Sequence, residues 1–198
     1  MRVILASASP RRRDLLTMIG IAHVVIPADV DETYGPEEVP RAHAERLARE
    51  KASVLAARAP DAVIIAADTI VVVDGDVLGK PRDADEAARD GHGGEDGVRT
   101  PREAAEHARG AKILSGVEEV GVTFRPLDDA TITSYVATGE PMDKAGAYGI
   151  QGYGAVFIES ISGSHSGVMG LPLFETAELL REAGIPYWNG TARGGVGT

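Results

Sequence analysis

The sequence predicts an α/β protein whose sheet combines parallel and antiparallel strands. Apolar runs of strand length alternate along the chain with amphipathic stretches of helix length, which is the pattern of a sheet covered by helices. The strongest strand signal, residues 62–73, is followed by Asp74-Gly75 and a short return segment. That dipeptide favours a tight hairpin, which adds antiparallel pairing to the alternating pattern.

The first half of the chain predicts two helices between short strands. Residues 2–6 and 22–27 are apolar runs of strand length. Between them Ser9 is a good N-cap and is followed by proline, so a helix is expected over residues 10–19. Residues 40–58 carry apolar side chains at helical spacing and predict a second, longer helix.

The alternation continues in the second half of the chain. Asp83 can cap a short helix through Ala88. Further expected elements are a strand near 117–125, a helix near 128–138, a strand near 154–161 and a helix over 172–183 closed by Gly184. The glycine-rich tail, residues 186–198, is expected to be loose.

Composition restricts the class of function. The 198 residues include 30 acidic and 20 basic side chains and have a net charge of −10, which argues against general nucleic-acid binding or an anionic membrane surface as partner. The absence of cysteine excludes disulfides, zinc–thiolate sites and a cysteine nucleophile, and is compatible with the cytoplasmic location that we expect. No apolar run has the length of a signal peptide or a membrane span.

The first candidate for chemistry is the segment from Ser7 to Arg13. A helix N-terminus presents free N–H groups and a positive dipole end, which suit phosphate. Three arginines in that first turn, Arg11, Arg12 and Arg13, oppose the dipole unless an anion binds there. The alternative interpretation is a solvated basic turn. The spacing of these residues alone favours neither phosphate binding nor a solvated turn.

A second candidate is Asp68, which interrupts the apolar run of residues 62–73. A buried carboxylate is costly unless it is paired, bound to metal or functional, so we favour a functional role over a strand-end cap. Lys80 lies between glycine and proline, and the glycine-rich segment 140–154 carries Lys144 and Gln151. Alone these are weak signals, because surface lysines and flexible loops are common. Residue chemistry thus indicates a polyphosphate pocket with one poised carboxylate.

Several motifs then resemble the Maf family of nucleotide pyrophosphatases. They are ILASASPRRRDLL (4–16), DVDET (29–33), LAREKA (47–52), AADTIVVVDGDVLGKPRDADEA (66–87), EPMDKAGAYGIQG (140–152) and VMGLPLFET (168–176). Together they span most of the chain in the family's order, so agreement by chance is excluded. The resemblance implies an elongated two-lobed fold, like that of inosine triphosphatases, with a central mixed sheet and a cleft between the lobes. Residues 1–185 would form this single domain.

The resemblance also implies an activity and its site. The expected enzyme is a hydrolase that converts a nucleoside triphosphate to the monophosphate and pyrophosphate with a divalent metal, magnesium or manganese. By motif position Asp68 would be the catalytic proton acceptor and would share the metal with Glu32. Specificity positions are Arg11, Thr69 and Gln151, and phosphate or cleft contacts are Ser7, Arg12, Lys51, Lys80 and Lys144. A homodimer is compatible with the family, although the sequence shows no interface.

Arg11-Arg12, Asp68-Thr69 and the AYGIQ run resemble the dTTP/UTP branch of the family rather than the 7-methyl-GTP branch. Three alternatives stay open: the 7-methyl-GTP activity, a broad house-cleaning pyrophosphatase acting on modified nucleotides, and a catalytically weak, nucleotide-binding regulator of cell division. A substrate panel separates the first two from the expected activity, and tight nucleotide binding without hydrolysis would identify the third.

Residues 89–116 depart from the family pattern. The first part of this segment is rich in glycine and charge, and the second part is rich in alanine and helix-like. The strand that usually follows at this point in the family is not recognisable. From sequence we therefore expect a sheet strand to be absent here and the segment to be disordered.

Overall fold

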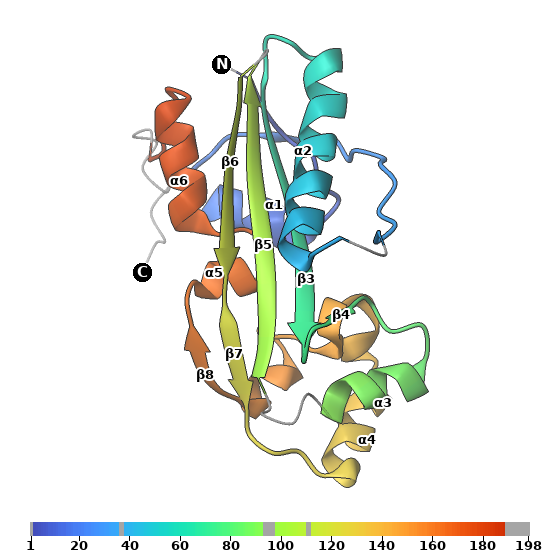
Figure 1. Cartoon of the computed structure of the whole chain (residues 1–198). Coiled ribbons are helices and arrows are strands. Elements are labelled where there is room, and N and C mark those ends of the chain that lie inside the picture. Colours follow the sequence, from blue (N-terminus) through green and yellow to red (C-terminus); the bar gives the residue numbers. More distant parts are fainter. Residues whose placement is uncertain (1, 36–37, 93–97, 110–111, 189–198) are drawn as a thin grey trace, which may run out of the picture.

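The computed structural model describes residues 2–35, 38–92, 98–109 and 112–188, with backbone only for 98–109 and 112–114. The described strands form one mixed sheet of eight strands in the order β2-β1-β3-β5-β7-β8, with β4 added to β3 and β6 to β5 (Figure 1). β1 (Val3–Leu5) is parallel to β2 (Val24–Val25) and to β3 (Val63–Val73), whereas the other pairings are antiparallel. This confirms the expected α/β class.

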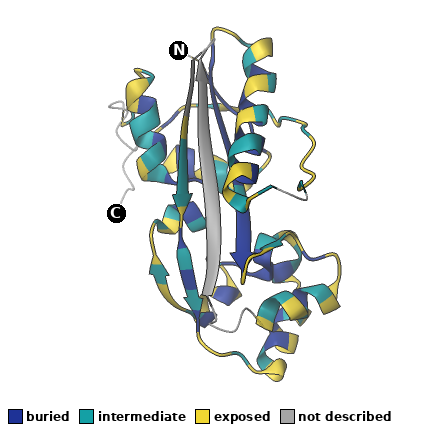
Figure 2. Ribbon diagram, viewed as in Figure 1, coloured by how far each residue is buried: buried dark blue, intermediate teal, exposed yellow. Residues whose placement is uncertain are grey.

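The half of the molecule at the top of Figure 1, which we call the upper lobe, has three layers, with helices on both faces of β1 and β3. Val3 and Ile65 pack against the face covered by α1 (Pro10–Met18) and α6 (Leu173–Glu182). Ile4 and Ile64 pack on the opposite face against α2 (Pro40–Arg58). Alternate strand residues thus enter opposite cores, which is why β3 is buried along its length (Figure 2).

The lower lobe has its own apolar core. The strands β3 and β4 (Asp76–Leu78) end in this lower half of the molecule. The lower lobe also contains α3 (Ala84–His92), α4 (Asp129–Ala137), β7 (Gly121–Phe124), β8 (Ile158–Ser162) and α5 (His165–Val168). Three short 3₁₀ helices, η1 (Glu140–Asp143), η2 (Ala145–Ala147) and η3 (Tyr153–Phe157), complete it. Edge-to-face pairs join Phe124 to Tyr148 and Tyr135 to Phe157, with ring centroids 5.0 Å apart in each pair. A core separate from that of the upper lobe explains the two-lobed shape.

Most sequence-derived elements are confirmed. The helix over 40–58 has the predicted bounds, and the helix after Ser9 ends one residue early, at Met18. Ser9 and Asp83 act as caps, because their side-chain oxygens accept the backbone N–H groups of Arg12 and Glu86. The strand predicted over 22–27 shrinks to Val24–Val25, two half-exposed residues at the edge of the sheet. Because the side chains at this edge are little buried, packing does not favour a longer strand.

The segment 89–116 corrects the sequence-based expectation of an absent strand. α3 continues to His92, and residues 98–109 form the strand β5, which pairs with β3 over Val63–Val72 and with β6 (Lys112–Glu119). The alanine-rich stretch is therefore extended rather than helical, because pairing on both edges overrides a weak local propensity. Residues 93–97 and 110–111, which fall within the segment expected to be disordered, lie outside the described residues.

The start of the tail is packed against the upper lobe. Ile185, the last residue of the predicted domain, is buried, and Tyr187, in the tail, packs on the cluster formed by α1, α6 and the sheet. The expected looseness beyond that point concerns residues 189–198, which lie outside the described part of the chain. Among the described residues, no helix is both long and apolar enough to cross a bilayer.

Glu118 on β6 lies within electrostatic reach of Glu175 on α6. Burial, followed by the charge of Glu175, raises the pKa of Glu118 above its ordinary 4.5. Among the described residues, Oε2 of both side chains is buried without a hydrogen-bond partner. A carboxyl whose pKa is raised by folding stabilises the fold while protonated and loses that contribution as pH rises through the folded pKa.

We therefore expect Glu118→Gln to raise the thermal midpoint at pH 7.5 and to leave it near the wild-type value at pH 4. Differential scanning calorimetry across pH 4–8 measures this difference. The matched control is Glu119→Gln, which changes a neighbouring exposed carboxylate on the same strand. A lower midpoint for Glu118→Gln at pH 7.5 would contradict the assignment of an unfavourable buried charge.

Candidate active site

A cavity of about 470 Å³ opens between the lobes. Its walls come from the loop between β1 and α1, the loop after β2, the middle of α2 and β3, and the segments around residues 143–150 and 168–170. The predicted site residues that line it are Ser7, Arg11, Arg12, Glu32, Lys51, Asp68, Thr69, Lys80 and Lys144. Gln151 is exposed and does not line the cavity, although its neighbour Ile150 does.

Arg12 is fixed in the cavity wall by contacts with three separate segments. Its Nε donates to the backbone oxygen of Gly170 (2.5 Å), and Nη1 donates to Ser7 Oγ (3.2 Å). Nη2 donates to Thr69 Oγ1 (2.7 Å). Ser7 precedes α1 and Thr69 lies on β3, so the guanidinium is oriented at the N-terminal end of the helix. A cation and free helix N–H groups together favour an anion.

Asp68, Lys51 and Glu32 form a charged triad. Lys51 Nζ lies 2.7 Å from Asp68 Oδ1 and 2.7 Å from Glu32 Oε1. Lys51 and Asp68 are 7% and 8% exposed, whereas the Glu32 side chain is 64% exposed. The buried aspartate found from the sequence is thus paired with a buried cation, which offsets the cost of burying it.

The electrostatics of the cavity favour the ionised form of Glu32. A hydrogen bond from Lys51 lowers the pKa of Glu32 below its ordinary 4.5, against the effect of burial, and the charges of Lys80 and Arg12 act in the same direction. Within the described residues, no group of three or more metal-binding side chains occurs. Asp68 and Glu32 nevertheless present oxygen ligands to one cavity. Magnesium in nucleotide enzymes is held by one or two carboxylates together with substrate phosphates, so this donor set fits such an ion.

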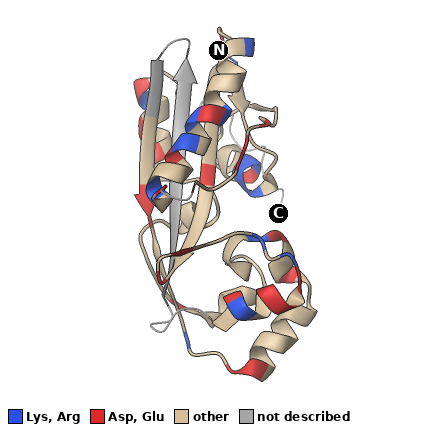
Figure 3. Ribbon diagram, turned by 45° about the vertical axis from the view of Figure 1, so that its right-hand side comes forward, with Lys and Arg blue, Asp and Glu red and all other residues tan. Residues whose placement is uncertain are grey.

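Two further cations line the lower side of the cavity. Lys144 Nζ donates to the backbone oxygen of Glu140 (2.7 Å) and pairs with Asp143 Oδ1 (2.5 Å). Lys80 follows Gly79, whose backbone oxygen accepts the N–H of Gly146 (3.1 Å). Along α2, basic residues are interleaved with acidic ones (Figure 3). The cavity lining carries five basic side chains against three acidic ones, and this excess of positive charge suits an anionic ligand.

A glycine-rich loop, residues 148–154, is wrapped around Glu140. The Glu140 carboxylate accepts the Tyr135 hydroxyl (2.8 Å) and the backbone N–H groups of Tyr153 (2.7 Å) and Gly154 (3.0 Å). A Cβ at Gly152 would lie 2.0 Å from Glu140 Oε2. This close approach to Glu140 therefore explains the glycine at 152, since a φ of −125° is not in the left-handed region that favours glycine.

We expect Gly152→Ala to lower the free energy of unfolding by about 1–3 kcal/mol, the usual cost of overpacking. For a chain of this size, that is a fall of roughly 2–12 °C in the thermal midpoint. Gly79→Ala is the matched control, because a Cβ at Gly79 meets nothing within 4 Å. A clash with Glu140 also predicts non-additivity: Gly152→Ala should cost less in a Glu140→Gly background. Equal costs in both backgrounds would exclude this contact as the cause.

Sequence reasoning missed Glu140 as the anchor of this loop and Gly170 as a partner of Arg12. The Arg12–Gly170 contact joins residues that are 158 positions apart, and Glu140 bonds backbone N–H groups 13 and 14 positions further on, so local spacing predicts neither contact. The glycine spacing at 149, 152 and 154 was the available signal, because it marks where a backbone passes close to something. It does not say that the neighbour is a carboxylate.

The fold and the cavity define an α/β protein with a cavity of basic and acidic side chains built around a buried carboxylate. The family model described as Maf-like protein matches residues 2–183, and the chain belongs to the Maf family.

Similar proteins extend over nearly the whole chain. A protein named dTTP/UTP pyrophosphatase from Anaeromyxobacter sp. (strain Fw109-5) is 49% identical, covering 98% of this chain and 97% of its own. Proteins of the same name from Symbiobacterium thermophilum and Aromatoleum aromaticum are 47% and 46% identical, covering 96% and 93% of this chain and 98% and 97% of their own. Among solved structures, the Staphylococcus aureus Ham1 protein matches with a TM-score of 0.47 and 14% identity over 63% of this chain and 72% of its own, and nothing about activity follows from that likeness.

Proposed function

We propose that this protein hydrolyses dTTP and UTP to the monophosphate and pyrophosphate. The observation that carries the proposal is the placement of Asp68, Lys51 and Glu32 in the same cavity as Arg12 and the N-terminus of α1. Relatives that bear the name dTTP/UTP pyrophosphatase align over 93–98% of this chain, and so support the substrate class.

Asp68 acts in this proposal as the proton acceptor for the attacking water. Lys51 donates to Oδ1, which orients the carboxylate and assigns Oδ2 to the water. Arg12, Lys80 and Lys144 face charge that develops on the leaving pyrophosphate. Ser7 and the free N–H groups of α1 bind phosphate oxygens. A divalent cation, magnesium or manganese, held by Asp68 and Glu32 would neutralise further phosphate charge when bound.

We assign substrate specificity to Arg11, Thr69 and Gln151. Thr69 accepts a hydrogen bond from Arg12, so it acts at least partly by orienting a phosphate-binding group. Gln151 follows the cavity-lining Ile150 on the loop anchored by Glu140, and reaches substrate only if that loop borders the bound base. The other assignments are a cytoplasmic location, no nucleic-acid or membrane partner, and a homodimer.

The test is pyrophosphate release from dTTP, UTP, CTP, GTP and 7-methyl-GTP at equal concentrations, with magnesium or manganese. Turnover of dTTP and UTP well above the others is the expected result. Preference for 7-methyl-GTP, or equal turnover of all five, would replace the proposed branch with another pyrophosphatase activity. Tight nucleotide binding with negligible hydrolysis of every substrate would favour the regulator of cell division.

A further inference from the structure

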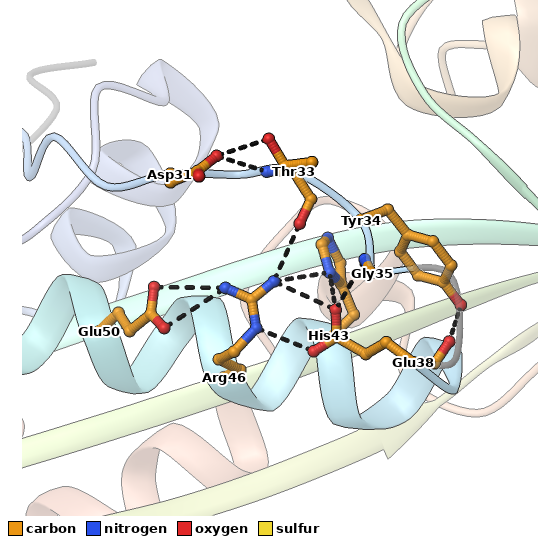
Figure 4. Close-up of polar contacts among 8 residues, drawn as sticks. All are labelled: Asp31, Thr33, Tyr34, Gly35, Glu38, His43, Arg46 and Glu50. Carbon is orange, nitrogen blue, oxygen red and sulfur yellow. Dashed lines mark hydrogen bonds and ion pairs between the residues drawn. The ribbon is translucent and has the colours of Figure 1, made fainter.

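The loop that carries Glu32 is also held to α2 by side chains that do not line the cavity, and Figure 4 shows their contacts. We call residues 28–35 the Glu32 loop. Arg46 Nη2 donates to the backbone oxygen of Thr33 (3.1 Å), the residue directly after Glu32. The same guanidinium donates from Nε to Glu38 Oε1 (2.8 Å) and from Nη1 to Glu50 (3.3 Å). Arg46 itself does not line the cavity.

Glu38 ties the far end of the loop to the same helix. Its Oε2 accepts Arg46 Nη2 (3.1 Å), pairs with His43 Nδ1 (2.8 Å) and accepts the N–H of Gly35 (3.3 Å). The hydrogen bond from Arg46, and then that with His43, lowers the pKa of Glu38 to about 2. The carboxylate is therefore ionised throughout the neutral range, and these contacts persist there.

Aromatic packing and a local turn stiffen the Glu32 loop. The ring of Tyr34 lies 4.7 Å from the ring of His43, a side chain only 6% exposed. Tyr34 also donates its hydroxyl to the backbone oxygen of Glu38 (2.5 Å). On the other side of Glu32, Asp31 Oδ1 accepts both the N–H and the hydroxyl of Thr33. Residues on either side of Glu32 are thus fixed by polar contacts.

Glu32 itself has little else to hold it. Its side chain is 64% exposed, and its ion pair is with Lys51, which lies on α2 as Arg46 does. Two side chains of α2 thus hold the loop on either side of the Glu32 backbone and carboxylate, in addition to the ring contact of His43 with Tyr34: Arg46 bonds the backbone after Glu32, and Lys51 meets the carboxylate within the cavity. A planar guanidinium suits the first contact because it can bond a carbonyl and two carboxylates at fixed angles.

We propose that Arg46 is a positioning residue that orients Glu32 toward Lys51 and Asp68 by fixing the backbone of the Glu32 loop. The expected effect of Arg46 on turnover rests on the proposed function. The expected effect of Arg46 on the loop is independent of that function. Residues that orient metal-binding side chains typically change metal affinity or activity by about 10–100-fold when replaced.

The experiment compares Arg46→Gln with Glu50→Gln. The second variant removes only the partner of Arg46 that lies one turn along the helix and leaves the loop contacts in place. In Arg46→Gln we expect kcat to fall about tenfold and the manganese concentration for half-maximal rate to rise about tenfold. KM for dTTP should change less than twofold, because the phosphate-binding cations are untouched. Glu50→Gln should match the wild type in all three.

Amide hydrogen exchange of residues 28–35, measured without nucleotide or metal, reports on the loop directly. We expect exchange in Arg46→Gln to be faster by about tenfold and exchange in Glu50→Gln to match the wild type. Arg46→Lys should resemble Arg46→Gln, since an ammonium cannot reproduce the fork. Equal effects of the Arg46 and Glu50 variants on exchange would overturn the proposal in favour of simple helix stabilisation.

A double-mutant cycle separates positioning from general damage. In a Glu32→Gln background, Arg46→Gln should lower kcat by less than twofold, because the group it positions is already lost. A full additional tenfold loss would overturn the link to Glu32. If the wild-type protein turns over none of the nucleotides, the proposed function fails, whereas the exchange measurement still decides whether Arg46 fixes the loop.

Discussion

Asp68→Asn is expected to lower kcat for dTTP by about 10³-fold and to leave nucleotide affinity within a few-fold of the wild type. General-base catalysis contributes about 10²–10⁴ in rate, and an amide cannot accept the proton. Binding should persist because Arg12 is oriented by Ser7, Thr69 and Gly170. Initial rates of pyrophosphate release give kcat, and calorimetric titration of dTTP in the presence of calcium gives the affinity.

The matched control for this prediction is Asp76→Asn. Asp76 is an exposed aspartate on β4, in the hairpin that follows β3, so its replacement tests any general effect of removing a negative charge. Wild-type turnover is expected for it. Near-normal turnover by Asp68→Asn would reject Asp68 as the base. A comparable loss of dTTP affinity and of kcat would make Asp68 a binding group instead.

The helices could be predicted from sequence because their signals are local. Ser9 with its following proline defines the start of α1, and apolar spacing defines α2. β3 was equally clear, because a run of β-branched residues with a DG turn at its end has few other solutions. In each case the segment's own preference agrees with its place in the fold.

β5 could not be predicted because its signal is not local. Residues 101–109 favour helix by composition, yet they pair with β3 on one edge and with β6 on the other. Without that strand the backbone of β3 would leave a long edge of N–H and C=O groups without partners, which is costly in a buried strand. The need of β3 for hydrogen-bond partners, and not the sequence of β5, thus explains why β5 is a strand.

The site was predictable in its residues but not in its contacts. Asp68 was visible as a charge in an apolar strand, and Arg12 as a charge at a helix N-terminus. The sequence placed Lys51 among the phosphate contacts, apart from Asp68 and Glu32. Only the packing of α2 on β3 shows that Lys51 lies between these two carboxylates. The role of Arg46 could not be predicted for the same reason, since Thr33 and Arg46 come into contact only in the folded chain.

Lys51→Met is expected to be the most destabilising single change in the cavity. It removes the cation from between two carboxylates and leaves Asp68, whose side chain is 11% exposed, without its ion-pair partner. Removing one member of a buried ion pair costs about 3–5 kcal/mol, or a fall of roughly 6–20 °C in the thermal midpoint for a chain of this size. Urea unfolding of the metal-free protein measures the free energy. Turnover should be lost as well, since Asp68 and Glu32 both lose their orienting partner.

If the penalty is the uncompensated charge on Asp68, removing that charge should restore stability. The double variant Lys51→Met/Asp68→Asn is therefore expected to be more stable than Lys51→Met alone, by at least half of the original loss. The exposed partner provides the control: Lys51→Met/Glu32→Gln should recover much less, because the Glu32 side chain is 64% exposed and water already solvates it. No recovery in the Asp68 double variant would assign the loss to packing of the lysine stem between α2 and β3. Equal recovery in both would mean that repulsion between the two carboxylates, rather than burial of Asp68, is what Lys51 offsets.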